Sequence, residues 1–314
     1  MQHSPALDAA EPAVQSQQAL ALRRLGHLLG LLLLLTVVVI LGGALVRATH
    51  SGDGCGDSWP SCHGDLVPSA DKSAQKTWVE WTHRASSGLM WLLSAGLALW
   101  SWRRLKAEDR VRRATLLSFF FMTTEALIGA LLVVLRLVAY NDSALRVLWV
   151  AMHLLNTFLL LAAMTWAWWW AYRPELKTQP LPPQLRWLLR LSLLGMLVVG
   201  CTGAIAALAD TLFPAVKQVS PWSPLLLRLR MWHPLVASGW GLILVLSAVR
   251  LAEYTRNLWL GVVIVVVLLL QMMVGWINIS LLTPITAQLI HLALADGLWI
   301  LLVASTAYAM GKRV

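Results

Sequence analysis

Four of the eight histidines in the sequence share a setting that suits metal chemistry. Neutral imidazole is a good axial ligand for haem iron, and two histidines on different helices of a bundle can hold a haem between them. A hydrogen bond to a neighbouring helix explains one such histidine, but four at matching positions favour paired haem ligation. Zinc is the alternative, although it would need cysteine or carboxylate ligands close by. Each of the four histidines stands within about two turns of the start of a long apolar run. They are His83, His153, His233 and His291.

A carboxylate distinguishes the first of these histidines from its counterpart in the second half of the chain. Glu80 precedes His83 by three residues and therefore shares its helix face, whereas an arginine holds that position before His233. A carboxylate near a reacting group can accept a proton or orient a water. One bound haem would then be a working substrate and the other a resident cofactor. The structural alternative pairs Glu80 with Arg84 or Arg47 and leaves it inert.

The three cysteines fall into two groups. Cys55 and Cys62 share the loop before Glu80, on the predicted oxidising side, where a disulfide can form. Cys201 lies inside an apolar run and is too distant to join them. The loop pair is either a structural staple or a redox-active dithiol, and the second role requires exposure and a suitable potential. No C-x-x-C-H motif occurs, so covalent c-type haem attachment is not indicated.

The elements that carry these residues are membrane helices. Of the 314 residues 58% are hydrophobic and only 13% are charged, with a mean hydropathy of +0.68, whereas soluble domains are about a quarter charged. A helix of about 20 apolar residues crosses the bilayer and satisfies its own backbone. We therefore predict an all-α integral membrane protein with eight transmembrane helices. They are expected at about His27–Val46, Trp81–Trp102, Ala114–Leu135, Val147–Tyr172, Leu191–Ala209, Met231–Val249, Leu258–Leu282 and Leu289–Met310.

The basic residues predict the orientation of these helices. Most of the 25 lysines and arginines lie in the loops on the side of both termini, and such residues favour the cytoplasm. Both termini are thus expected in the cytoplasm, with the haem sites towards the outer face. The same clustering accounts for the net charge of +10 without any nucleic-acid partner. Residues 1–26 are polar and predict a disordered cytoplasmic tail.

The two halves of the chain repeat each other. The segment "EALIG" from Glu125 matches "QMMVG" from Gln271, and each has a polar residue four positions before a glycine. An even number of spans per half gives both halves the same orientation, related by a pseudo-two-fold axis along the membrane normal. We predict two four-helix bundles, residues 27–172 and 191–314, joined by a cytoplasmic linker at 173–190.

The outer loop makes a family resemblance specific. Arg47 followed by "SGDGCGDSWPSCHG" and then "EWTHR" resembles the haem A synthase family. That family has an arginine and a Ser-Gly turn after span one, then a Trp-Pro-x-Cys segment and a Glu-aromatic-x-His-Arg start to span two. The eight spans and duplicated halves also match, so the resemblance covers about residues 27–310. One departure is that family members with cysteines often carry a second pair between spans five and six, where this chain has none.

The resemblance implies an oxidoreductase that converts haem O to haem A. It oxidises the C8 methyl group to a formyl group by successive hydroxylations. The N-terminal half would hold the substrate haem O, and the C-terminal half would hold a haem b cofactor for electron transfer. The implied roles are Glu80 as catalytic acid or base, His83 and His153 on the haem O iron, and His233 and His291 on the haem b iron. Arg47 and Arg84 are expected to contact haem propionates.

The resemblance also implies a setting: the bacterial inner membrane and its lipid, a haem O synthase that supplies the substrate, and oxidase assembly factors. The electron acceptor is unknown, and a homo-oligomer is left open. Two other functions stay open. A non-enzymatic di-haem b electron-transfer protein would not need Glu80. A transporter would line a path with polar residues, although packing or interhelical hydrogen bonding is the alternative for Gln271 and Asn156. Those path residues are Glu125, Asn156, Gln271 and Asp296.

Overall fold

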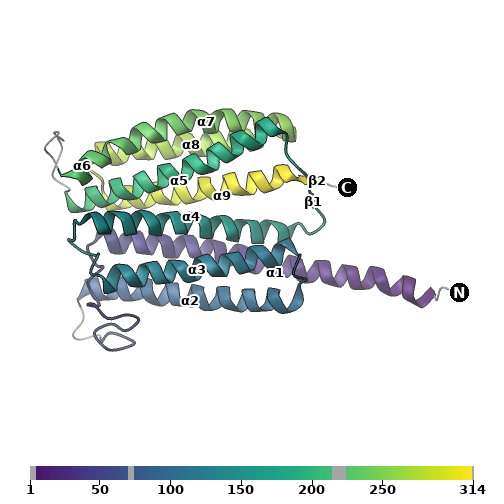
Figure 1. Ribbon diagram of the computed structural model, residues 1–314, viewed down its shortest axis with the longest axis horizontal. Helices are drawn as coiled ribbons and strands as arrows, with labels where there is room; N and C mark the ends of the chain where they lie inside the picture. The colour runs from purple at the N-terminus through teal and green to yellow at the C-terminus, as the bar shows by residue number, and fades with distance from the viewer. Residues whose placement is uncertain (1–4, 70–73, 214–223, 313–314) are drawn as a thin grey trace.

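The computed structural model describes residues 5–69, 74–213 and 224–312, which form long antiparallel helices (Figure 1). Parts of the predicted tail, of two predicted outer loops and of the C-terminal end lie outside the described residues. The helices are α1 (Pro5–Ala48), α2 (Gln75–Arg104), α3 (Arg110–Val134), α4 (Ala144–Tyr172), α5 (Pro183–Leu212), α6 (Leu225–Arg230), α7 (Trp232–Thr255), α8 (Leu258–Ser280) and α9 (Ile285–Met310). The strands are β1 (Lys177–Thr178) and β2 (Gly311–Lys312).

Within the described residues, seven helical segments are long and apolar enough to cross a membrane. They lie in α1, α3, α4, α5, α6 with α7, α8 and α9. Large apolar side chains also stay exposed, for example Leu28, Leu31 and Leu34 on α1, which suits a surface that faces lipid rather than water. The prediction of an all-α membrane protein is confirmed. The helix α2 is not among the seven, because serine, glycine and tryptophan dilute its apolar stretch.

The first helix is longer than the sequence predicted. It begins at Pro5 and so continues through a segment for which a disordered tail was expected. Alanine, leucine, glutamine and arginine dominate this stretch and are strong helix formers. Proline suits the first turn of a helix, and each added residue extends a helix that the apolar part has already nucleated. The extension projects beyond the ends of the other helices (Figure 1).

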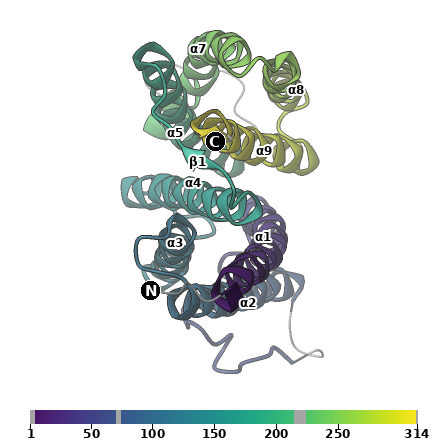
Figure 2. The same cartoon turned by 90° about the vertical axis from the view of Figure 1, so that its right-hand side faces the viewer.

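The long helices gather into two groups (Figure 2). In the first, α1 to α4 pack in chain order and α4 closes onto α1; in the second, α5, α7, α8 and α9 pack in the same order. Helices α1 and α4 meet α5 and α9 where the groups join. At this junction Trp299 Nε1 donates to the Phe158 carbonyl at 2.7 Å, and the two rings stack with centroids 5.2 Å apart. One buried apolar cluster runs through both groups.

The two ends of the molecule carry different connections between the long helices. The start of α1 and the end of α9 lie at the same end, where β1 pairs with β2 and fastens the α4–α5 connection to the end of α9. The α1–α2 loop and α6 lie at the opposite end (Figure 1). The predicted outer-face histidines all belong to this second end, since each lies near the start of a helix that begins there.

Candidate functional site

A cavity of about 1480 Å³ lies among the helices of both groups. It exceeds the roughly 300–1,000 Å³ of ordinary small-molecule sites, and its walls are mainly apolar. The structure therefore brings together residues that lie far apart in the sequence. Every predicted site residue except the two cysteines lines this cavity: Arg47, Glu80, His83, Arg84, His153, His233 and His291.

Each of the four predicted ligand histidines lies beside a glycine of a neighbouring helix. A Cβ atom on three of these glycines would come within about 3 Å of an imidazole carbon, so the imidazole would have to shift to make room. The glycines therefore make room for the imidazoles between the helices. Sequence reasoning saw them only as part of the repeat and missed this role. The pairs, with the distance from an added Cβ to the imidazole Cε1, are Gly43–His83 (2.9 Å), Gly129–His153 (3.9 Å), Gly203–His233 (3.1 Å) and Gly275–His291 (3.0 Å).

The two histidines of the second group face each other. The ring centroids of His233 and His291 are 6.3 Å apart, with planes inclined at 87°. Two metal–nitrogen bonds of about 2 Å each fit into this spacing. Nδ1 of His233 lies 3.2 Å from the Thr202 hydroxyl, and a second contact of this kind commonly orients a metal-binding imidazole. The amide Nε2 of Gln271 lies 3.3 Å from Nε2 of His291. The pair suits an iron held between two helices.

The first group has a carboxylate where the second has Gln271. Glu125 Oε1 lies 3.4 Å from Nδ1 of His153, and Glu125 also accepts hydrogen bonds from Asn156 and Thr157. Of the residues proposed for a transport path, Glu125 and Gln271 thus lie beside histidines on the cavity wall. Asp296 is fully buried, and neither of its carboxylate oxygens has a hydrogen-bond partner among the described residues.

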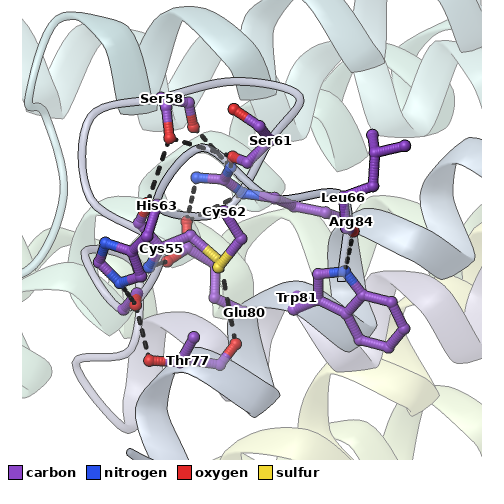
Figure 3. The surroundings of a disulfide bond; sticks show 11 residues. Cys55, Ser58, Ser61, Cys62, His63, Leu66, Thr77, Glu80, Trp81 and Arg84 are labelled. Atoms are coloured by element: carbon purple, nitrogen blue, oxygen red, sulfur yellow. Dashed lines mark hydrogen bonds and ion pairs between the residues drawn. A yellow bond between two sulfur atoms is a disulfide. The ribbon is translucent and has the colours of Figure 1, made fainter. Parts of the chain in front are cut away.

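Glu80 is buried and tightly bound at the start of α2 (Figure 3). Its Oε1 accepts a hydrogen bond from Arg84 at 2.7 Å, and its Oε2 accepts the backbone N–H of Cys55 at 2.8 Å. Arg84 also donates to the carbonyls of Ser58 and Ser61, at 2.7 and 2.9 Å. Of the two arginines that could neutralise Glu80, the structure thus pairs it with Arg84. The pair fixes the carboxylate at the cavity wall and ties the outer loop to α2.

The outer loop is closed by the predicted disulfide between Cys55 and Cys62 (Figure 3). Both cysteines are buried, with exposed fractions of 0% and 1%. The loop is fastened to α2 by two further hydrogen bonds, from the Thr77 hydroxyl to the Gly54 carbonyl and from Trp81 Nε1 to the Leu66 carbonyl. Burial of this kind favours a staple over an accessible redox-active dithiol.

Arg47 reaches from the end of α1 into the second group. It donates to the Ala207 carbonyl at 2.6 Å, to the Thr211 hydroxyl, and to Gln288 Oε1 at 2.9 Å. It therefore links α1 to α5 and α9 at the end of the molecule that carries the α1–α2 loop. The position of a cationic side chain near the cavity mouth suits a carboxylate ligand.

Arg146 is a cavity residue that sequence reasoning missed. It is buried in the first turn of α4, where one of its terminal nitrogens donates to the carbonyls of Ala139 and Asn141. Its Nε has no hydrogen-bond partner among the described residues. The signal was present in the sequence, because a charged residue at the start of an apolar span, seven positions before His153, is a candidate functional residue.

The zinc alternative requires three or four ligands around one point. Across the described ranges, no three histidine, cysteine, aspartate or glutamate side chains form such a group. Each helix group instead contributes two histidines to the cavity, of which His233 and His291 lie face to face, and a haem iron needs only two axial ligands from the protein. The donor set therefore fits a haem better than a zinc ion.

The helical fold and this site define a multi-pass membrane protein with a buried cavity built around paired histidines. The chain belongs to the COX15-CtaA family of cytochrome oxidase assembly proteins, whose model matches residues 26–303. The predicted resemblance to the haem A synthase family is thereby confirmed.

Two groups of relatives are similar to this chain. A protein of Thermus thermophilus named protoheme IX farnesyltransferase is 39% identical over 303 residues, which cover 90% of this chain and 48% of that protein. Proteins named heme A synthase from Bacillus mycoides and Bacillus cereus are 44% and 43% identical over 98 residues, about 31% of either chain. This chain thus spans about half the length of the Thermus relative.

Proposed function

We propose that this protein is a haem A synthase, an oxidoreductase that converts the C8 methyl group of haem O to a formyl group by successive hydroxylations. The observation that carries the proposal is that the four predicted ligand histidines all line the cavity, two from each helix group, and that each lies beside a glycine. Membership of the cytochrome oxidase assembly family and the similarity to proteins named heme A synthase support it. The volume of the cavity leaves room for more than one ordinary ligand.

The two pairs of histidines have different tasks in this proposal. His83 and His153 bind the iron of the substrate haem O in the N-terminal group. His233 and His291 hold a haem b in the C-terminal group, where the Gln271 amide beside His291 must move aside. When bound, haem b supplies one-electron redox chemistry. The spacing of the second pair and the apolar walls support this assignment.

Glu80 is the proposed catalytic base. Oxidising a methyl group releases protons, and a carboxylate at the cavity wall can accept one or orient a water. The contacts with Arg84 and with the Cys55 N–H hold its carboxylate in one position. Positioning of this kind is what general base catalysis requires. Arg47 and Arg84 remain the proposed propionate contacts, since both line the cavity.

The fold completes the proposal. We place α2 across the membrane as an eighth span, because its 30 residues exceed the length that a bilayer requires and it packs between α1 and α3. The two helix groups, residues 27–172 and 191–314 with a linker at 173–190, are then related by a pseudo-two-fold axis along the membrane normal. Both ends lie in the cytoplasm of a bacterial cell, and the histidines lie towards the outer face of its inner membrane. The basic loops support this orientation.

The substrate requires a supplier. The family resemblance implies a supplier of haem O, and the Thermus relative, about half of which this chain covers, is named protoheme IX farnesyltransferase. We therefore propose a haem O synthase as the protein that hands over the substrate, and oxidase assembly factors as recipients of the product. The acceptor of the electrons and any homo-oligomer stay unassigned.

Pigment extraction tests the proposal. Full-length protein, produced together with a haem O supply, is expected to contain haem b together with haem O or haem A. His83→Ala should remove haem O and haem A and keep haem b, whereas His233→Ala should remove haem b. Glu80→Gln should keep both pigments but slow haem A formation by about 10²-fold or more. A wild-type protein without haem would reject the proposal.

A non-enzymatic di-haem b protein is the second candidate. The pairing of Glu80 with Arg84 favours it, because that contact gives Glu80 a structural role without catalysis. Glu80→Gln separates the two functions. Undiminished haem A formation in this variant would remove the catalytic role of Glu80, and two haem b groups with no haem A in the wild type would establish the second candidate.

A further inference from the structure

Three of the four predicted ligand histidines lie beside a backbone group, but the fourth faces a carboxylate. In the three similar cases, the nearby backbone belongs to the residue four positions before the cradling glycine. These residues are Val39 for His83, Val199 for His233 and Gln271 for His291. For His153 the residue at that position is Glu125, and its side-chain Oε1 lies 3.4 Å from Nδ1 of the imidazole.

The surroundings of Glu125 hold it as a hydrogen-bond acceptor. Asn156 Nδ2 donates to Oε2 at 2.6 Å, and the Thr157 hydroxyl donates to Oε1. The orientation of the Asn156 amide is fixed in turn, because Nδ2 also donates to the Phe121 carbonyl at 2.9 Å and Oδ1 accepts from Thr124 at 2.7 Å. Both neighbours of Glu125 on α4 therefore present donors, so both carboxylate oxygens are held in fixed positions, with Oε1 towards His153.

The second group offers a natural comparison. Gln271 stands four residues before Gly275, as Glu125 stands four residues before Gly129. It is the neutral amide of nearly the same shape, and its side chain lies beside His291. The duplicated scaffold thus places a carboxylate beside Nδ1 of His153 and, at the equivalent position, an amide beside Nε2 of His291.

We propose that Glu125 is a positioning residue that keeps Nδ1 of His153 as the hydrogen-bond donor and turns Nε2 towards the bound iron. A carboxylate partner makes a ligating imidazole more basic, and hydrogen bonding to the ligand set tunes the potential of a haem iron. The more basic ligand favours ferric iron. The iron in the N-terminal group therefore has a lower midpoint potential than it would have with an amide partner. This inference rests on the proposed function, since it requires haem bound by His153.

Potentiometric titration of full-length protein loaded with iron protoporphyrin IX tests the inference. The variants are Glu125→Gln, which gives the first group the amide of the second, and Gln271→Glu, which makes the reverse change. Variants lacking His83 or His233 assign the optical bands to the two groups. Glu125→Gln should raise the ferrous-to-ferric ratio of the N-terminal haem about tenfold at a fixed potential, equivalent to about 59 mV for one electron. The C-terminal haem should not change.

Gln271→Glu should shift only the C-terminal haem, and in the opposite direction. A structural role for Glu125 would alter haem content or thermal stability without these opposed shifts. An unchanged N-terminal midpoint in Glu125→Gln with haem still bound would overturn the inference and leave the proposed function intact. If Glu125→Gln does not hold haem, an unchanged C-terminal midpoint in Gln271→Glu overturns it. Wild-type protein that binds no haem through His153 would overturn the proposed function itself.

Discussion

The outer ends of the two helix groups share a scaffold but differ in charge. Each places a histidine beside a glycine near the start of a helix. In the first group Glu80 and Arg84 form an ion pair whose side chains are 3% and 11% exposed, beneath a disulfide-closed loop. In the second, Arg230 pairs with Asp210, and these side chains are 21% and 15% exposed. Function resides in sites set on a scaffold, so under the proposed function we expect the two groups to divide their chemistry at these charged differences.

Breaking the ion pair of Glu80 and Arg84 should change the free energy of unfolding more than any other substitution considered below. Glu80→Ala leaves Arg84 as a buried charge without its carboxylate. It should therefore lower the free energy of unfolding by about 3–5 kcal/mol. Asp210→Ala removes the partner from a more exposed pair and should cost about 1 kcal/mol. Thermal unfolding of both variants in one detergent measures the difference. Glu80→Gln, which keeps an acceptor for the Cys55 N–H, is the matched control. Equal losses for the two alanine variants would contradict the assignment of a special environment to Glu80.

The sequence predicted the features that follow from composition and local spacing. Apolar runs identify the helices, and the three-residue step from Glu80 to His83 places both side chains on one helix face. Sequence spacing could not identify the partner of Glu80. Arg84 lies on the same helix as Glu80, but Arg47 lies on another helix, and its distance from Glu80 depends on how the helices pack. Only the tertiary packing shows that Arg47 turns away towards α5 and α9. The sequence also could not predict the glycine cradles. Glycine is common in membrane spans, and which side chain of another helix lies against it depends on how the helices pack.

Substitutions in the glycine cradles should have an intermediate effect on stability. A methyl group on Gly275 would come within 3.0 Å of His291, whereas one on Gly129 would stay 3.9 Å from His153. Gly275→Ala should therefore push the imidazole aside and cost about 1–3 kcal/mol. Gly129→Ala should be neutral or stabilise its helix by up to about 1 kcal/mol.

The measurement for these two variants combines thermal unfolding with titration of iron protoporphyrin IX, followed by the optical spectrum. Gly275→Ala should weaken binding in the second group, and Gly129→Ala should leave binding in the first group unchanged. If both variants bind haem like the wild type, the glycines would be packing residues of the helix interface and not cradles for ligating imidazoles.

The smallest effect concerns a position where the two groups differ deep inside the molecule. Asp296 stands five residues after His291, as Phe158 stands five residues after His153. Phe158 packs on Trp299, whereas the carboxylate of Asp296 is fully buried and has no hydrogen-bond partner within the described part of the chain. An unsatisfied buried polar group costs about 1–3 kcal/mol.

An amide of nearly the same shape loses less hydration free energy on burial than a carboxyl group does, so Asp296→Asn should raise stability in thermal unfolding by about 1 kcal/mol. It should leave both pigments and haem A formation unchanged, since Asp296 does not line the cavity. Phe158→Leu on the other group is the control for packing at the same depth and should lower stability instead. If Asp296→Asn kept its pigments but lost activity, Asp296 would belong to a proton or transport path, and the buried difference between the groups would be functional, as we propose for Glu80.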